Sequence, residues 1–302
     1  MLNIKNIHFS YVDKKVVKGI SEKIISGEFI SVIGVNGSGK STFLNCVYGG
    51  LELQKGQIFW NDKRIKGPKE SLIPGHSGFK LVSQDSKVNE YMTVQENLEM
   101  SFKQKSKSFV KKRITELLNQ FGLKKNRHIK ACDLSGGLRQ RLALTCALAA
   151  DPEVLLLDEP FSQIDFHNTF VMLSILNKIR KENRLTIIYV SHETSGIMYV
   201  SDRILVLDKG RVIQRGYPDE IYRLPKNETV AGLTGLYSVI NNEIYRPENI
   251  IIAPEGIPVS VINKFTYNQK TILECKNNKG EVYYLYETNK FNQNDKITIA
   301  PV

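Results

Sequence analysis

The segment GVNGSGKS, residues 34–41, constrains the fold more than any other part of this 302-residue chain. It fits the pattern G-x-x-x-x-G-K-[ST]. The stretch EFISVIG before it predicts a buried strand, and STFLNCVY after it predicts a helix that stops at Gly49 and Gly50. A strand, a glycine loop and a helix in this order can bind phosphate, because backbone N–H groups and the helix N-terminus then face the anion. A flexible strand-to-helix turn is the alternative, and this context disfavours it.

A second apolar run, residues 154–157, predicts a parallel strand that ends in the adjacent acids Asp158 and Glu159. Buried carboxylates are costly unless they are paired or bind a metal. In a phosphate-binding loop, Lys40 can reach the β- and γ-phosphates and Ser41 can bind Mg²⁺. Asp158 suits the same Mg²⁺, and Glu159 suits the polarisation of an attacking water.

The segment LSGGLRQRL contains a further predicted helix start, at Ser135 followed by two glycines. Such a start is a second anion site by the same reasoning, and an ordinary N-cap is the alternative. One nucleotide can hardly occupy both helix starts from the same side.

Several motifs in this order make the chain resemble the ATP-binding subunit of an ABC transporter over about the first 235 residues. Besides the Walker A loop, the LSGG signature and Walker B, the matches include the Q-loop at Gln84, the D-loop at Asp165, the H-loop at His192 and an aromatic residue at Tyr11. The signature has Leu138 where glutamine is common, which is a mild departure. The resemblance implies Glu159 and His192 as catalytic residues, and Ser41, Gln84 and Asp158 as the Mg²⁺ ligands. It implies ATP binding by Tyr11, Gly34, Asn36, Gly37, Ser38, Gly39, Lys40, Ser41, Thr42 and Gln84.

The same resemblance implies an α/β P-loop NTPase core, residues 1–235, with an inserted helical subdomain at about residues 88–150. Two chains would meet head to tail, so that each ATP lies between the Lys40 loop of one chain and Ser135, Gly136 and Gly137 of the other. The expected partners are transmembrane permease subunits, a second ATPase subunit (an identical copy in the simplest case) and, indirectly, a solute-binding protein. The resemblance further implies a peripheral subunit at the cytoplasmic face of the inner membrane, and no apolar run approaches the roughly 18 residues of a membrane helix.

The helical subdomain carries most of the chain's formal net charge of +11. Residues 101–130 hold ten Lys and Arg residues and one acid, Glu116, which makes the excess local. Because the charge is local and no coiled-coil insertion is present, no nucleic-acid partner is expected. The charge is hypothesised to favour the anionic inner leaflet or acidic loops of the membrane subunits, with a solvated basic face as the alternative. Within the subdomain, TVQENLEM predicts a capping box from Thr93 to Glu96, and residues 108–123 predict an amphipathic helix.

After a short helix and a linker, residues 236–302 alternate in the manner of short strands, which predicts a small all-β barrel. This region resembles the C-terminal barrel of ATPase subunits from importers of iron(III), oxyanions, polyamines or sugars. It is expected to be a regulatory or dimerisation domain, with a stabilising appendage as the alternative. The barrel favours ATP-driven solute import; an exporter subunit or a soluble ABC ATPase outside transport is the alternative. The four cysteines form no C-x-x-C pair, which predicts reduced thiols and no metal site.

Overall fold

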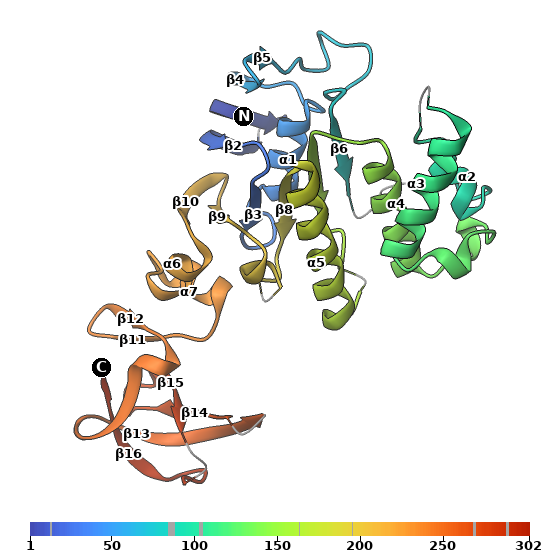
Figure 1. Cartoon of the computed structure of the whole chain (residues 1–302). Coiled ribbons are helices and arrows are strands. Elements are labelled where there is room, and N and C mark those ends of the chain that lie inside the picture. Colours follow the sequence, from blue (N-terminus) through green and yellow to red (C-terminus); the bar gives the residue numbers. More distant parts are fainter. Residues whose placement is uncertain are drawn as a thin grey trace. The chain divides into compact units, whose positions relative to one another are not determined.

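The computed structural model divides into two compact units, Met1–Pro218 and Asp219–Val302 (Figure 1). It describes residues 1–12, 14–83, 88–102, 105–162, 164–194, 196–267, 270–287 and 290–302. Gln84, the predicted Q-loop residue, lies outside these ranges. Each unit has its own hydrophobic core.

The first unit is built on a six-stranded sheet with the order β10-β9-β3-β8-β7-β6. All neighbours pair in parallel except β10 and β9, which form a hairpin. The strands are β3 (Phe29–Ile33), β6 (Phe79–Val82), β7 (Val154–Asp158), β8 (Thr186–Ser191), β9 (Arg203–Asp208) and β10 (Arg211–Gly216). Every residue of β3 and β8 is buried, as expected for parallel strands covered on both faces. The strands predicted before the glycine loop and before Asp158 are therefore confirmed.

A second, antiparallel sheet has the order β2-β1-β4-β5. Its strands are β1 (Leu2–Tyr11), β2 (Lys14–Ile24), β4 (Lys55–Trp60) and β5 (Lys63–Arg64). Helix α1 (Lys40–Tyr48) follows the glycine loop as predicted and ends at Gly49, whose φ is 81°. Phe43 and Leu44 of this helix share one core cluster with Ile4 and Leu156. The loop is thus fixed between a buried strand and a buried helix face.

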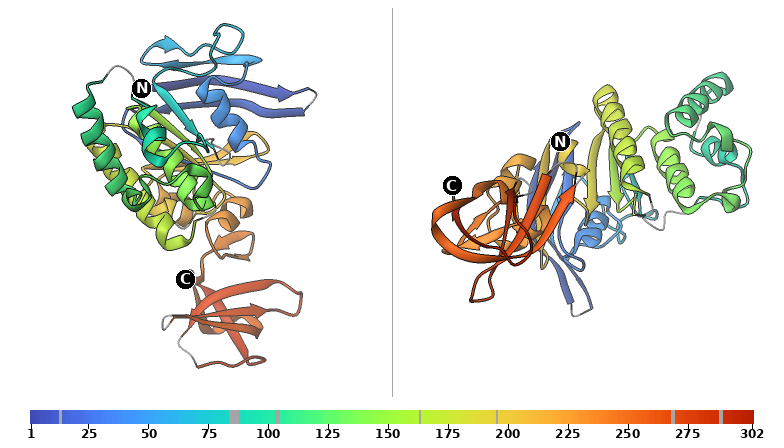
Figure 2. Two further views of the ribbon diagram at one scale, coloured as in Figure 1. Left: turned by 90° about the vertical axis from the view of Figure 1, so that its right-hand side faces the viewer. Right: turned by 90° about the horizontal axis from the view of Figure 1, so that it is seen from below.

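Three helices form a lobe beside the six-stranded sheet, visible as the green cluster in Figure 2. They are α2 (Val94–Glu99), α3 (Lys107–Gln120) and α4 (Gly136–Ala149). Thr93 and Glu96 make both hydrogen bonds of the predicted capping box. The predicted apolar face of α3 is also confirmed, because Ile114, Leu117 and Leu118 are fully buried.

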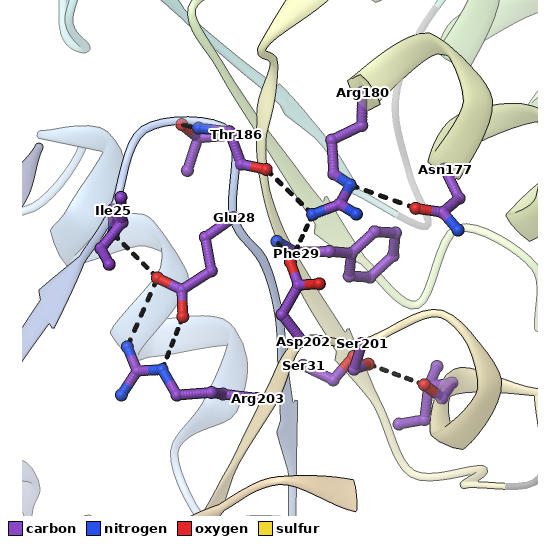
Figure 3. A network of polar contacts seen from close by, with 12 residues as sticks. Ile25, Glu28, Phe29, Ser31, Asn177, Arg180, Thr186, Ser201, Asp202 and Arg203 are labelled. Atoms are coloured by element: carbon purple, nitrogen blue, oxygen red, sulfur yellow. Dashed lines mark hydrogen bonds and ion pairs between the residues drawn. The ribbon is translucent and has the colours of Figure 1, made fainter. Parts of the chain in front are cut away.

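Polar contacts join the strands of the large sheet at the end where β3 begins (Figure 3). Arg180 of α5 (Phe166–Asn183) donates to the carboxylate of Asp202 and to the carbonyl oxygen of Gly27, the latter at 2.9 Å. Asp202 accepts the backbone N–H of Phe29 at 2.8 Å. Arg203 pairs with Glu28 in the same region. These contacts fix the start of β3 against α5 and β9, and so fix the register of the strand that leads into the glycine loop.

The second unit contains the predicted all-β region. Its main antiparallel sheet has the order β15-β14-β13-β16, formed by β13 (Ile250–Tyr267), β14 (Lys270–Lys276), β15 (Val282–Glu287) and β16 (Lys296–Pro301). A two-stranded sheet, β11 (Ser238–Ile240) with β12 (Glu243–Tyr245), precedes it. Strand β13 bends at Gly256, so that Ile252 and Ile257 both pair with Ile299. The bend curls the sheet around a core that includes Leu273 and Leu285.

Two short helices, α6 (Pro218–Arg223) and α7 (Glu228–Thr234), precede these strands, and the second lies where the sequence suggested a linker. Arg246, which is 2% exposed, holds them to the strands. Its guanidinium donates to the carbonyl oxygens of Tyr222 at 2.8 Å and of Ala231 and Leu236 at 3.0 Å. Because one buried cation satisfies three backbone carbonyls, the helices belong to the second unit.

The four cysteines are free thiols. Burial raises the pKa of Cys46 and of Cys146 to about 12, so both stay protonated at neutral pH. Within the described ranges, every helix is too short or too polar to span a bilayer.

Candidate functional site

The glycine loop turns from β3 into α1 with an open cradle. Gly37 and Gly39 have φ values of 77° and 102°, a left-handed conformation that favours glycine. A Cβ at Gly37 would meet nothing within 4 Å, which leaves space for a ligand against the backbone. The hydroxyl oxygen of Ser38 is buried without a hydrogen-bond partner. An open cradle beside an unsatisfied hydroxyl fits the phosphates of a nucleotide.

The loop rests on the β9–β10 hairpin, a support that the sequence reasoning missed. The backbone N–H of Gly210 donates to the carbonyl oxygen of Ser38 at 2.9 Å. A Cβ at Gly34 would lie 2.1 Å from the carbonyl oxygen of Leu207. This contact joins segments about 170 positions apart, and no local pattern reports it.

Lys40 is 6% exposed and folds back onto its own loop. Its ammonium group donates to the carbonyl oxygens of Gly34 at 2.8 Å and Val35 at 3.1 Å. Burial lowers the pKa of Lys40, while the nearby carboxylates of Glu159 and Asp158 oppose that shift. The cation is therefore held inside the cradle, where an anionic ligand would strengthen its charged form.

Ser41 and Asp158 meet at the ends of two different elements. The Ser41 hydroxyl donates to Oδ1 of Asp158 at 2.9 Å, which brings the start of α1 to the end of β7. Burial raises the pKa of Asp158, and the Ser41 hydrogen bond opposes the shift. One hydroxyl and one carboxylate suit Mg²⁺, which keeps waters and uses substrate phosphates as further ligands. The described residues contain no cluster of three or more His, Cys, Asp and Glu side chains that could hold a metal alone.

Glu159 and His192 form a second pair at the same sheet edge. Nδ1 of His192 lies 3.0 Å from Oε1 of Glu159. Glu159 has a φ of 49°, a conformation that costs a non-glycine residue about 1–2 kcal/mol. Its backbone N–H donates to the carbonyl oxygen of Val190 at 3.1 Å and fixes this turn. Such strain is typical of functional positions, and here it directs the carboxylate toward the residue that follows β8.

The signature residues lie in the helical lobe. Ser135 caps α4, and its hydroxyl accepts the backbone N–H of Leu138 at 3.4 Å. Gly136 and Gly137 form the first residues of that helix. Helix α4 packs against α2 and α3 and against β6 of the large sheet.

Asp165, the predicted D-loop residue, caps α5. It accepts the backbone N–H of Asn168 at 3.0 Å and its side-chain amide at 2.7 Å. These hydrogen bonds lower the pKa of Asp165. Asn168 also accepts a hydrogen bond from Arg141 of α4 at 2.9 Å, a link to the signature helix that the sequence did not suggest.

The remaining predicted ATP-binding residues lie on β1, in the glycine loop and on α1. Tyr11 ends β1, is 50% exposed and makes an edge contact with Phe9, with ring centroids 4.8 Å apart. Its exposure leaves a ring face open to an adenine base. Asn36 is exposed in the loop, and Thr42 is half-buried on α1.

These elements define a P-loop ATPase: a phosphate cradle with its lysine, a hydroxyl–carboxylate pair for a metal, and an acid–histidine pair at one sheet edge. The family model for "ABC transporter" matches residues 17–162. The chain is 30% identical over 301 residues to the spermidine/putrescine import ATP-binding protein PotA of Mycoplasma mycoides, covering 90% of this chain and 84% of the relative. It is 33% identical over 265 residues to the methionine import ATP-binding protein MetN of Clostridioides difficile, covering 87% and 78%.

Solved structures agree with these relatives. The structure of cbiO1 from Clostridium perfringens, described as part of the ABC transporter complex cbiONQ, has a TM-score of 0.66 at 27% identity and covers 73% of this chain and 89% of its own. The dimeric ATP-binding cassette MJ0796, bound to ADP and Pi, has a TM-score of 0.64 at 25% identity and covers 72% and 99%. The chain belongs to the ABC transporter family, as an ATP-hydrolysing subunit of the importer type. The predicted family, fold class and ATPase activity are thereby confirmed, and import is supported over the exporter and non-transport alternatives.

Proposed function

We propose that two copies of this chain close on two ATP molecules, that Glu159 drives hydrolysis, and that this cycle powers solute import. The observation that carries the proposal is the convergence of two pairs, Ser41 with Asp158 at 2.9 Å and His192 with Glu159 at 3.0 Å. Both pairs involve adjacent residues at the end of β7. A metal-binding position therefore lies beside a carboxylate that can act on water.

Each residue has a distinct role in the proposed mechanism. Lys40 leaves its loop carbonyls for the β- and γ-phosphates, and the backbone N–H groups of residues 37–42 hold the same phosphates. Ser41, Asp158 and Gln84 would hold Mg²⁺, which when bound neutralises charge on the phosphates. Glu159 accepts a proton from the attacking water. His192, whose Nδ1 lies 3.0 Å from the Glu159 carboxylate, keeps that carboxylate oriented and contacts the γ-phosphate.

The second half of each site is supplied by the partner copy. Ser135, Gly136 and Gly137 present a helix start with free N–H groups, which suits the γ-phosphate of ATP held by the other chain. The contact is isologous and closes at two subunits. ATP then stabilises the closed dimer by binding it more tightly than the open state, and hydrolysis removes that preference.

The partners outside the dimer are proposed to be transmembrane permease subunits, with a solute-binding protein acting on them, at the cytoplasmic face of the membrane. Exposed basic residues on α3 and the turn after it, including Lys111, Lys112 and Lys124, are available for anionic lipid or acidic permease loops. The transported solute is proposed to belong to the iron(III), oxyanion, polyamine or sugar class. The PotA relative, named for spermidine and putrescine import, aligns with 90% of the chain, and the FbpC relative, named for Fe(3+) ion import, aligns with 93%. Polyamines and iron(III) are therefore the first candidates. Residues 236–302 would regulate or dimerise the ATPase.

Hydrolysis assays on the purified full-length chain test the proposal. Glu159→Gln is expected to reduce kcat by about 10²-fold or more, because the amide cannot accept the proton. Lys40→Ala is expected to weaken ATP binding. Glu182→Gln makes the same chemical change as Glu159→Gln at an exposed residue of α5 and should hydrolyse ATP normally. Normal hydrolysis by Glu159→Gln would contradict the assigned role.

A further inference from the structure

A small cavity lies directly beside the Glu159–His192 pair. Its volume is about 20 Å³, and the residues lining it include Glu159, Tyr189, Ser191 and His192, each of which carries a polar side-chain group. Phe161 and Leu173 supply apolar walls. A water needs about 10–15 Å³ by this measure and two or more polar partners, so the cavity suits one water molecule.

Tyr189 places a phenol at this cavity with little freedom to move. It is 3% exposed on β8, and its ring packs near those of Phe29 and Phe161, with centroids 6.3 and 6.0 Å away. Its hydroxyl makes a hydrogen bond with the side chain of Ser191. Burial raises the pKa of Tyr189, so the phenol stays protonated and able to donate at neutral pH.

Ser191 fixes the second hydroxyl at the cavity. It is buried at the end of β8, and its side-chain oxygen accepts the backbone N–H of Glu193 at 3.0 Å. His192 lies between Ser191 and Glu193 in the sequence, so the hydrogen bond between these two residues constrains the turn that contains His192. Oε1 of Glu159 contacts Nδ1 of His192. The orientation of the other carboxylate oxygen, Oε2, therefore depends on the other groups around this carboxylate.

We propose that Tyr189 and Ser191 are positioning residues for the Glu159–His192 pair, and that they act through one water bound in this cavity. The water bridges the two hydroxyls to the pair and holds the Glu159 carboxylate so that its free oxygen faces the attacking water. Neither residue contacts the reacting atoms. The inference rests on the proposed role of Glu159 as the base.

The test measures kcat and KM for ATP with the full-length chain. Tyr189→Phe keeps the ring and removes the hydroxyl, and Ser191→Ala removes the other. Each substitution is expected to lower kcat about ten-fold and to leave KM within two-fold of wild type. The expected loss in kcat is smaller than the roughly 10²-fold loss that a 1 Å misplacement of a reacting group causes, because the carboxylate is only less well oriented. The double variant should be no slower than the slower single variant, because both act on the same water. Ser191→Thr, which retains the hydroxyl, should restore kcat.

A matched control is Tyr283→Phe in the second unit, another buried tyrosine, whose hydroxyl donates to Glu281 at 2.8 Å. It should leave kcat unchanged. The inference fails if Tyr189→Phe keeps the wild-type kcat, or if the losses of the two single variants multiply in the double variant. It also fails if kcat, KM and melting temperature change together. The Glu159→Gln variant separates the positioning role from the proposed function. If Glu159→Gln loses hydrolysis and Tyr189→Phe does not, only the positioning role of Tyr189 and Ser191 fails. If Glu159→Gln hydrolyses ATP normally, both fail.

Discussion

Replacing Gly34 by alanine tests how closely the glycine loop depends on its support. The added Cβ would lie 2.1 Å from the carbonyl oxygen of Leu207 and 2.7 Å from the hydroxyl of Ser38. Real Cβ contacts essentially never fall below 3.0 Å, so the loop and the β9 backbone must separate by about 0.9 Å. A shift of this size moves the N–H groups that hold the phosphates. Because a misplacement of about 1 Å costs roughly 10²-fold, Gly34→Ala should reduce ATP hydrolysis about 100-fold.

Overpacking should also lower the free energy of unfolding of this variant by about 1–3 kcal/mol. The assay is steady-state hydrolysis, with ATP binding measured by calorimetry and melting measured in parallel. Gly122→Ala is the matched control, because Gly122 has a φ of 67° but a Cβ there meets only the end of Arg141, at 3.6 Å. It should lose about 1 kcal/mol of stability and keep full activity. Wild-type hydrolysis in Gly34→Ala would refute the reasoning.

Three further predictions concern stability. Arg246→Met leaves three carbonyls unsatisfied and should destabilise the second unit by about 3–5 kcal/mol, seen as a lower melting transition; an unchanged melt would contradict the structural role. Folding raises the pKa of Asp158, so its native state binds more protons and stability falls as pH rises above about 3.8. Asp158→Asn should therefore melt higher at neutral pH while losing Mg²⁺-dependent hydrolysis, and a lower melt would disprove this. Thr93→Ala removes the capping box and should cost about 1 kcal/mol in denaturant unfolding. Thr115→Ala is the control, because half-buried Thr115 lies inside α3 and caps no helix end, and it should cost clearly less.

The glycine loop and the acids of β7 could be predicted because local patterns encode them. A β-branched run predicts the strand, the GVNGSGKS spacing predicts the loop, and an amphipathic run predicts the helix. The three segments follow one another directly in the sequence. The capping box at Thr93 was predictable for the same reason. The left-handed conformation of Glu159 was not, because nothing in the residue type signals it and the strand ends around it impose it.

Other features depend on contacts between distant segments. Gly210 supports the loop through Ser38, and the sequence gives no sign of which loop a hairpin turn will touch. Strand β13 continues through Pro254, Gly256 and Pro258, although proline and glycine are unfavourable inside a strand. It continues because its pairing with β16 resumes after the bend at Gly256. Helix α7 forms where a linker was expected, because Asn227 caps it and Arg246 binds the carbonyl oxygen of Ala231 within it. Tertiary contacts decided each of these.

In the proposed cycle ATP holds two copies together and hydrolysis by Glu159 releases them, and light scattering of the purified chain with ATP follows both steps. Glu159→Gln should form a stable dimer that persists with ATP, while wild type returns to monomers as ATP is hydrolysed. Monomers in both, under conditions where calorimetry shows ATP bound, would contradict it.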